Sequence, residues 1–236
     1  MNAEQEKVVS RIPVSRVRAL HAAIALADSG GIESLSMRKL AKDLGIEAMS
    51  LYYHVKSKDD ILDGMVGLVV EEMALPAPGT EWKVALRERA ESERAVLARH
   101  PWAISQMDAR TTRPTMKYHD VMIGCLLGAG FTMPLAAHAL SLVDSYVHGF
   151  ALQEASLPFD DEGDIRAATE NILERQEAME QSFPHLTEMA RTLILQPDYA
   201  YGNEFGFGIG LILDGLEQAR ISPAAAPGAR PNRRQE

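Results

Sequence analysis

Two short helices joined by a glycine turn are predicted for residues 36–58, which read SMRKLAKDLGIEAMSLYYHVKSK. Ser36 is a residue type that caps helix N-termini, and the apolar residues after it recur at helical spacing. Gly45 supplies the positive φ that a tight turn needs, and a second helix is expected from about Glu47 to Val55. Because the segment ends in aromatic, imidazole and ammonium groups, it is able to lie in the major groove of DNA.

One further helix is expected on each side of this pair. The preceding helix has apolar residues at helical spacing and ends at Gly30-Gly31. The following helix starts at Ser57, within a sequence that resembles a capping box, and continues to about Met73. Pro76 to Gly79 then breaks the chain. We therefore predict a helix-turn-helix DNA-binding domain over residues 14–75, preceded by a disordered arm over residues 1–13.

The charge of the chain is unevenly distributed. The whole chain has a net charge of −9, but residues 11–58 contain eight basic and four acidic side chains. A basic head on an acidic body is typical of a DNA-binding module joined to a regulatory domain. The negative net charge therefore does not argue against nucleic-acid binding.

The chain beyond the break looks helical throughout. Long helices are expected over residues 82–100, before Gly128, over 134–157 and over 203–220, and a charged helix and a short helix are expected between the last two. The sequence thus predicts an all-α protein with an N-terminal three-helix helix-turn-helix domain. A larger helical ligand-binding and dimerisation domain is expected over residues 80–220, followed by a disordered Ala/Pro/Arg-rich tail over 221–236.

Residue types at the end of the helix pair suit contacts with DNA. Hydroxyl, imidazole and ammonium groups bind phosphates, and Arg38 is the side chain best suited to a bidentate contact with guanine. An ordinary helical hairpin with solvated charges would show the same periodicity. Spacing alone therefore leaves both interpretations open.

The same segment resembles the DNA-binding region of tetracycline-repressor (TetR) family regulators. The shared pattern comprises Arg38-Lys39-Leu40-Ala41, Leu44-Gly45 and Leu51 to Lys58. The resemblance implies that one set of side chains lies near base edges or phosphates: Arg38, Glu47, Ala48, Met49, Ser50, Tyr52, Tyr53, His54 and Lys58. Ala48 and Met49 stand where the tetracycline repressor itself has Gln and Pro, so the operator sequence does not carry over.

The resemblance extends over about residues 14–220 and implies a dimerising domain with an inducer pocket. The helix over 134–157 is apolar nearly all round and must be covered on several sides. Gly206, Gly208 and Gly210 weaken the last helix and would let another backbone approach closely. We therefore expect a two-fold, four-helix interface that makes the protein a homodimer.

A pocket for a small-molecule effector is expected from adaptable methionines and a few polar groups. The predicted lining is Met107, Arg113, Met116, His119, Met122, Leu126, Leu140, Asp144 and His148. The methionines are open to a second interpretation as residues that fill core, and His119 and His148 as core histidines with satisfied hydrogen bonds.

The family's tetracycline-binding residues are not present in this chain. Ala74, Arg89, Glu93 and Ala109 occupy the positions at which the tetracycline repressor holds magnesium-tetracycline through His, Asn, Phe and a metal-binding His. A metal-bridged tetracycline is therefore not expected, and no metal or cofactor is predicted. The predicted effector is another bulky, largely apolar molecule.

Two other functions are considered, that of an enzyme and that of a ligand-independent DNA-binding protein. Asp144 and His148, with His119 and Cys125, could form a metal or acid–base site, but the chain has no CxxC, HExxH or glycine-rich phosphate loop. We therefore predict that the protein is not an enzyme. A ligand-independent DNA-binding protein stays open as the alternative.

The compartment is predicted from the single cysteine and the short apolar runs. Cys125 excludes an internal disulfide and suits a reducing compartment. No apolar run approaches the roughly 20 residues of a membrane span, and no signal peptide is expected. We expect a cytoplasmic transcriptional regulator, most simply a repressor, that binds a pseudo-palindromic operator and is released by an inducer.

Overall fold

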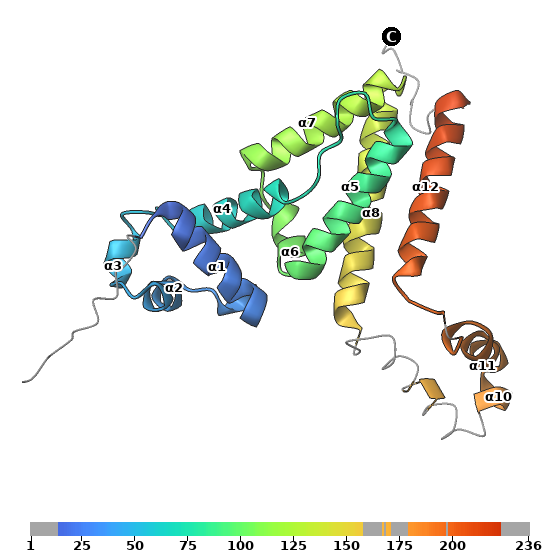
Figure 1. Cartoon of the computed structure of the whole chain (residues 1–236), viewed down its shortest axis with the longest axis horizontal. Coiled ribbons are helices and arrows are strands. Elements are labelled where there is room, and N and C mark those ends of the chain that lie inside the picture. Colours follow the sequence, from blue (N-terminus) through green and yellow to red (C-terminus); the bar gives the residue numbers. More distant parts are fainter. Residues whose placement is uncertain (1–13, 158–166, 168, 171–178, 197, 223–236) are drawn as a thin grey trace, which may run out of the picture. The chain divides into compact units, whose positions relative to one another are not determined.

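The computed structural model describes residues 14–157, 167, 169–170, 179–196 and 198–222, and every regular element in these ranges is a helix (Figure 1). The chain forms two compact units, one of residues 1–72 and 99–117 and the other of residues 73–98 and 118–236. Residues 99–117 therefore group with the head, although the sequence break at 76–79 places them in the body. The expected N-terminal arm, most of the expected charged helix and most of the expected tail lie outside the described residues.

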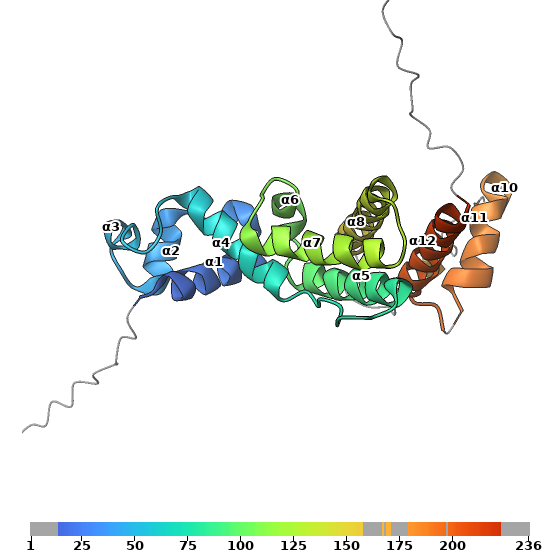
Figure 2. The ribbon, with the colours of Figure 1, turned by 90° about the horizontal axis from the view of Figure 1, so that it is seen from above.

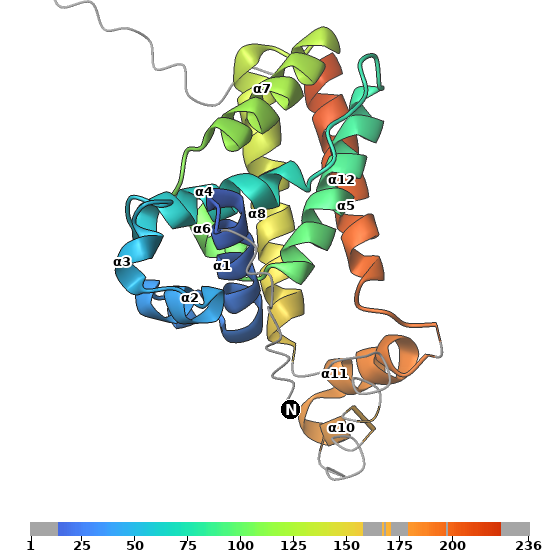
Figure 3. The same cartoon turned by 60° about the vertical axis from the view of Figure 1, so that its left-hand side comes forward.

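The first unit contains the predicted helix-turn-helix (Figure 3). Its elements are α1 (Arg16–Gly30), the 3₁₀ turn η1 (Ile32–Ser34), α2 (Met37–Leu44), α3 (Ala48–Leu51) and α4 (Lys58–Glu71), with α6 (Ala103–Met107) packed on α4. Serine hydroxyls begin three of these helices. Those of Ser15, Ser36 and Ser57 accept hydrogen bonds from the backbone N–H groups three residues ahead, at 3.1–3.2 Å.

The core of the head comes from the apolar stripes that the sequence predicts. Leu20 and Ile24 of α1, Leu40 and Leu44 of α2, and Leu51 of α3 are all buried. Gly45 adopts φ 69° and ψ 33°, and its backbone N–H closes the end of α2. The left-handed glycine thus redirects the chain between the two helices, as predicted.

The predicted helix over Glu47 to Val55 is shorter than expected. Helix α3 ends at Leu51, and the backbone N–H groups of Tyr52, Tyr53 and His54 bond to the carbonyls three residues back. Aromatic and imidazole side chains have lower helix propensity than straight-chain residues, which favours this tighter turn. The turn still exposes the side chains of Tyr52 and Tyr53 and leaves that of His54 half-buried.

The second unit is built from long helices. They are α5 (Trp82–Arg99), α7 (Arg113–Gly128), α8 (Met133–Ser156) and α12 (Asn203–Ile221), with α10 (Met179–Ser182), α11 (Pro184–Met189) and the π-turn η2 (Ala190–Ile194) before α12. Helices α5 and α7 each cross the boundary between the units. Helices α8 and α12 lie side by side in Figures 1 and 3, and Figure 2 shows the same helices from above.

The contact between α8 and α12 explains one of the three predicted glycines. A Cβ placed on Gly208 would collide with the phenol of Tyr146 from α8, whereas a Cβ on Gly206 would meet nothing within 4 Å. The Tyr146 hydroxyl donates towards the carbonyls of Glu204 and Phe205, each at 3.1 Å. Gly208 therefore makes room for a side chain of its own chain, and not for a second backbone as the sequence suggested.

No helix among the described residues is both long enough and apolar enough to span a lipid bilayer.

Candidate functional site

The first candidate site is the exposed surface of α2, α3 and the turn after them. The predicted DNA-contacting side chains lie there at the surface: Arg38, Glu47, Met49, Tyr52, Tyr53 and Lys58 are exposed, and Ala48, Ser50 and His54 are half-buried. Tyr53 is 88% exposed and Met49 is 75% exposed, which is unusual for large apolar side chains. All nine predicted residues thus lie on α2, on α3, in the turns beside α3 or at the start of α4, and none of them is buried.

Local packing explains why these side chains point outwards. Leu51 and Val55 are buried on one side of the segment, so the residues between them face solvent. Among the described residues, Arg38, His54 and Lys58 make no ion pair, so their charges and donors are available to a ligand. Exposed cations and aromatic rings on a short helix are the residue types that bind phosphates and base edges.

The second candidate site is a buried polar cluster inside the second unit. It joins α5, α7 and α8 through Arg89, Glu93, Tyr118, Asp144 and His148. The side chains of Arg89 and Glu93 are each 1% exposed. Nη2 of Arg89 binds Oδ1 of Asp144 and lies 3.3 Å from Oε2 of Glu93, while Nε2 of His148 lies 3.0 Å from Oε1 of Glu93. The guanidinium also lies 5.0 Å from the centre of the Tyr118 ring.

The protonation states of this cluster follow from its contacts. Burial works to lower the pKa of Arg89, but the charges of Glu93 and Asp144 outweigh it, and the pKa is raised. Burial works to raise the pKa of Asp144, but the contacts with His119 and Arg89 lower it overall. Burial, with the charge of Glu93, raises the pKa of Tyr118. Arg89 is therefore a cation, Asp144 an anion and Tyr118 a neutral phenol at neutral pH.

Several polar atoms of the cluster have no hydrogen-bond partner within the described chain. They are Nε and Nη1 of Arg89, Oε2 of Glu93 and the hydroxyl of Tyr118. Buried polar groups in native proteins are nearly always paired, and those that are not call for an explanation. The cluster is therefore the best candidate in the second unit for binding a polar group from outside the chain.

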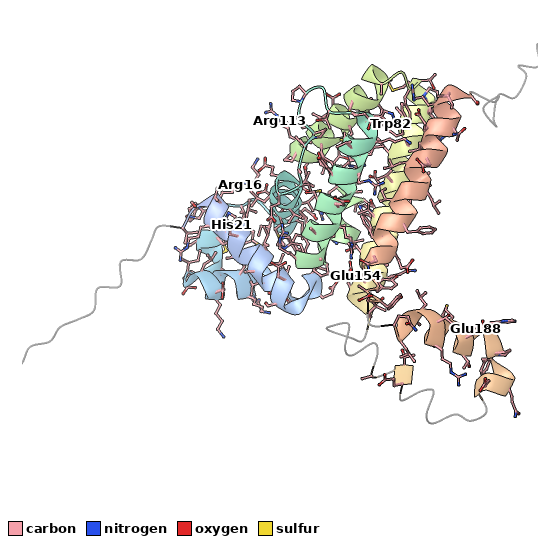
Figure 4. The ribbon with its side chains drawn as sticks, turned by 45° about the vertical axis from the view of Figure 1, so that its right-hand side comes forward. Arg16, His21, Trp82, Arg113, Glu154 and Glu188 are labelled. Atoms are coloured by element: carbon pink, nitrogen blue, oxygen red, sulfur yellow. The ribbon has the colours of Figure 1, made fainter. Side chains whose placement is uncertain are left out.

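The predicted ligand residues fall into three environments. Asp144 and His148 belong to the cluster, and His119 lies at its edge, with its Nε2 3.7 Å from Oδ2 of Asp144. The apolar members Met122, Leu126 and Leu140 are buried in the core of the second unit. The remaining three are Met107, Arg113 and Met116, which belong to the first unit. Figure 4 marks Arg113 at the start of α7, where its side chain is exposed.

The predicted lining did not include Arg89, Glu93 and Tyr118, although the resemblance aligns Arg89 and Glu93 with two positions at which the tetracycline repressor holds its ligand. A signal was present, because α5 buries residues 82, 85, 86, 89, 90, 93, 96 and 97 in a regular helical stripe. Arg89 and Glu93 are the two charged members of that stripe. Charges at core positions are rarely buried unless they are paired, so this pattern indicates a buried polar site.

A cleft of about 540 Å³ lies elsewhere in the second unit. The loop of residues 76–82 forms one wall, and Val121, Gly124, Cys125 and Gly128 of α7 line the other. None of the predicted ligand residues lines this cleft. Its walls offer small and apolar groups, and burial raises the pKa of the Cys125 thiol, which makes the thiol less nucleophilic.

The arrangement does not support the metal or acid–base site that was weighed as an alternative. Asp144 is bound to Arg89, and His148 is bound to Glu93. Among the residues that the structure describes, no three His, Cys, Asp or Glu side chains are placed to hold a metal ion together.

Comparison with known proteins covers both units. Residues 19–65 match the family described as bacterial regulatory proteins, tetR family, and residues 75–220 match the tetracyclin repressor-like C-terminal domain. The HTH-type transcriptional repressor DrrR1 of Streptomyces coeruleorubidus is 30% identical over 213 residues, which are 85% of this chain and 76% of that protein. The class A tetracycline repressor from transposon 1721 of Escherichia coli is 30% identical over 217 residues, which are 89% and 94% of the two chains.

A solved structure shares the fold. The crystal structure of the TetR family protein ActR from Streptomyces coelicolor, in complex with (S)-DNPA, aligns with a TM-score of 0.67 and 25% sequence identity. The alignment covers 89% of this chain and all of that one.

Proposed function

Because the chain belongs to the tetR family of bacterial regulatory proteins, we propose that it is a ligand-responsive repressor that binds a pseudo-palindromic operator as a homodimer. The family is one of transcriptional regulators and not of enzymes. The observation that carries the proposal is the exposed segment of residues 47–58, with its unpaired donors and solvent-facing aromatic rings. This segment would contact the major groove, with Lys58 and Tyr52 on phosphates and Arg38 near base edges.

A homodimer is supported by the outer faces of α8 and α12. Leu142 and Leu152 of α8 are 48% and 60% exposed, and Phe207 and Leu211 of α12 are 68% and 60% exposed. Ser145 and Gly149 between the leucines of α8 are small and exposed. Apolar side chains grouped on neighbouring helices mark interaction surfaces. Two copies that cover these faces would place two DNA-binding segments on one duplex.

Release of DNA by a small molecule is the second part of the proposal. The ligand would bind at the polar cluster of the second unit and favour a dimer in which the two segments no longer match successive major grooves. A shift from 1:99 to 99:1 between two such states needs about 5.5 kcal/mol of differential affinity. Linkage requires that operator binding weaken ligand binding by the same factor. The duplex and the effector are both cytoplasmic in this scheme.

The direct test is a gel-shift titration of the purified protein with the duplex that lies upstream of its own gene. We expect a complex of two chains per site that competitor DNA of unrelated sequence does not displace. A protein that bound this duplex no better than unrelated DNA at low salt would contradict the proposal. A ligand-independent DNA-binding protein would give the same complex, but no small molecule would release it.

A further inference from the structure

The cluster of Arg89 and Glu93 contains polar atoms that no other described residue satisfies. Nε and Nη1 of Arg89 are donors, Oε2 of Glu93 is an acceptor and the hydroxyl of Tyr118 is both, and all four atoms are buried without a hydrogen-bond partner among the described residues. The side chains of Arg89 and Glu93 are each 1% exposed, so solvent does not reach them freely. Nothing among the described residues completes their hydrogen bonds, so the cluster has donors and an acceptor to offer to a bound molecule.

The charges around the cluster determine what kind of partner fits. Arg89 is a cation beside two carboxyl groups, those of Asp144 and Glu93. An anionic ligand group would meet both carboxyl groups at close range, and a cationic group would meet the guanidinium. Burying an additional charge carries a large desolvation cost unless the charge is paired. An uncharged polar group is the partner that avoids both penalties.

The positions of the free donors and the free acceptor indicate which uncharged polar group of a ligand would fit. Nη2 of Arg89, which is bound to Asp144, lies 3.3 Å from Oε2 of Glu93, so the guanidinium group that carries the free donors lies beside this acceptor. A single hydroxyl group is both donor and acceptor. Its oxygen is able to accept an N–H of Arg89 while its own hydrogen is donated to Oε2 of Glu93.

We propose that Arg89 and Glu93 form a clamp for one uncharged hydroxyl group, phenolic or alcoholic, on a largely apolar effector. This inference rests on the proposed function, and it assigns the chemical class of the molecule that the second unit recognises.

The surroundings of the clamp agree with an apolar body for this molecule. The helices that carry the cluster bury apolar residues within one turn of it: Leu86 on α5, Met122 on α7 and Val147 on α8. The polar side chains of the cluster and its edge differ in exposure: Glu93 is 1% exposed, His148 15%, Asp144 25% and His119 48%. These polar side chains therefore extend from the buried Glu93 to the exposed His119, and we propose that a ligand enters on the side of His119.

The test uses three naphthalene probes that differ in one substituent: 2-naphthol, 2-methoxynaphthalene and 2-naphthoate. Each is titrated into the full-length protein by isothermal calorimetry. We expect 2-naphthol to bind at least about tenfold more tightly than the methyl ether, because the ether cannot donate to a charged acceptor. Equal binding of the two, tighter binding of 2-naphthoate, or no binding of 2-naphthol would each overturn the clamp.

Two variants and one control test whether Arg89 and Glu93 cause the preference for 2-naphthol over the methyl ether. Glu93→Gln keeps the shape but removes the charged acceptor, and the preference for 2-naphthol should fall to about threefold or less. Arg89→Met removes the donors and should weaken 2-naphthol more than the ether. Glu154→Gln changes another Arg–Glu pair, that of Arg94 on α5 and Glu154 on α8, and should leave the preference unchanged. A preference that survived in both Glu93→Gln and Arg89→Met would place the hydroxyl elsewhere and reject the clamp.

Gel shifts with the promoter duplex, without any probe, separate this inference from the proposed function. If the wild-type protein binds the duplex and shows no preference for 2-naphthol, the clamp is wrong, but the proposed function as a DNA-binding regulator is kept. If the protein binds no duplex, the proposed function is wrong, and a preference for 2-naphthol would then describe a hydroxyl site in a protein with another role.

Discussion

Nη1 of Arg16 lies 2.7 Å from Oδ2 of Asp60, and this pair joins the first turn of α1 to the first turn of α4. Nη2 of Arg16 also donates to Oδ1 of Asp60 at 2.8 Å, so the contact is bidentate. The same carboxylate accepts the backbone N–H of Lys56 at 2.8 Å. Asp60 thus fixes the short loop that links the DNA-contacting turn to α4.

Substitution Asp60→Asn should destabilise the head by about 1 kcal/mol, because an exposed pair contributes little but this one is bidentate and also binds the backbone. Hydrogen bonding from Arg16 lowers the pKa of Asp60 below its ordinary value. A carboxyl group with a lowered pKa stabilises the folded state above the unfolded pKa of roughly 3.9, and that contribution is lost as the pH falls through the folded pKa. Urea unfolding from pH 7 to pH 3 should therefore show the difference between wild type and variant shrinking at the acid end. An equal difference at both ends would contradict the assignment.

Lys58→Ala should weaken operator binding with little change in stability, since the side chain is exposed and makes no ion pair among the described residues. Loss of one phosphate contact per subunit should reduce the salt slope of log K by about 2 for a dimer. The control is Lys83→Ala, which removes an ammonium group of α5 that pairs with Asp214 in the second unit. A control that lowered the slope as much as Lys58→Ala would remove Lys58 from the DNA interface.

Gly208→Ala should destabilise the second unit by about 1–3 kcal/mol, because the added methyl group overlaps the phenol of Tyr146. Gly124→Ala is the control, since a Cβ at that position in α7 would meet nothing within 4 Å. Helix propensity predicts that the control is neutral or up to about 1 kcal/mol more stable. Thermal unfolding of both variants measures the contrast, and a Gly208→Ala protein as stable as wild type would show that the α8–α12 contact is misassigned.

Leu211→Asp should dissociate the homodimer at micromolar concentration, because the substitution would bury a carboxylate in the interface proposed for α8 and α12. Leu127→Asp on α7, where the leucine is 38% exposed, is the control that should stay dimeric. Analytical ultracentrifugation gives the mass of each. A Leu211→Asp protein that sedimented as a dimer would place the interface on another face.

The sequence predicted most of the head because its signals are local. Ser36 as a cap, Gly45 in the left-handed conformation and the buried leucines of α1 and α2 all lie where spacing and residue type put them. The early end of α3 was missed, because the tightening after Leu51 depends on the balance between helix propensity and packing of Val55. The described boundaries of the long helices α5, α8 and α12 fall within about two residues of their predicted positions.

The polar cluster could be predicted only in part. Asp144 and His148 were proposed from their spacing on one helix, but Arg89 and Glu93 come from another helix, and their pairing depends on how the two pack. A single sequence does not give that packing. The role of Gly208 was misjudged for the same reason, since Tyr146 lies 62 positions earlier in the chain and its contact is visible only in three dimensions.

Footprinting of the DNA upstream of the gene tests the central claim most directly. The account predicts protection of a pseudo-palindrome whose two halves lie on one face of the duplex, about one helical turn or a multiple of it apart. It also predicts that Lys58→Ala loses this protection and Lys83→Ala keeps it. Absence of any protected site for the wild-type protein at low salt, or protection of a single half-site by one chain, would contradict the account.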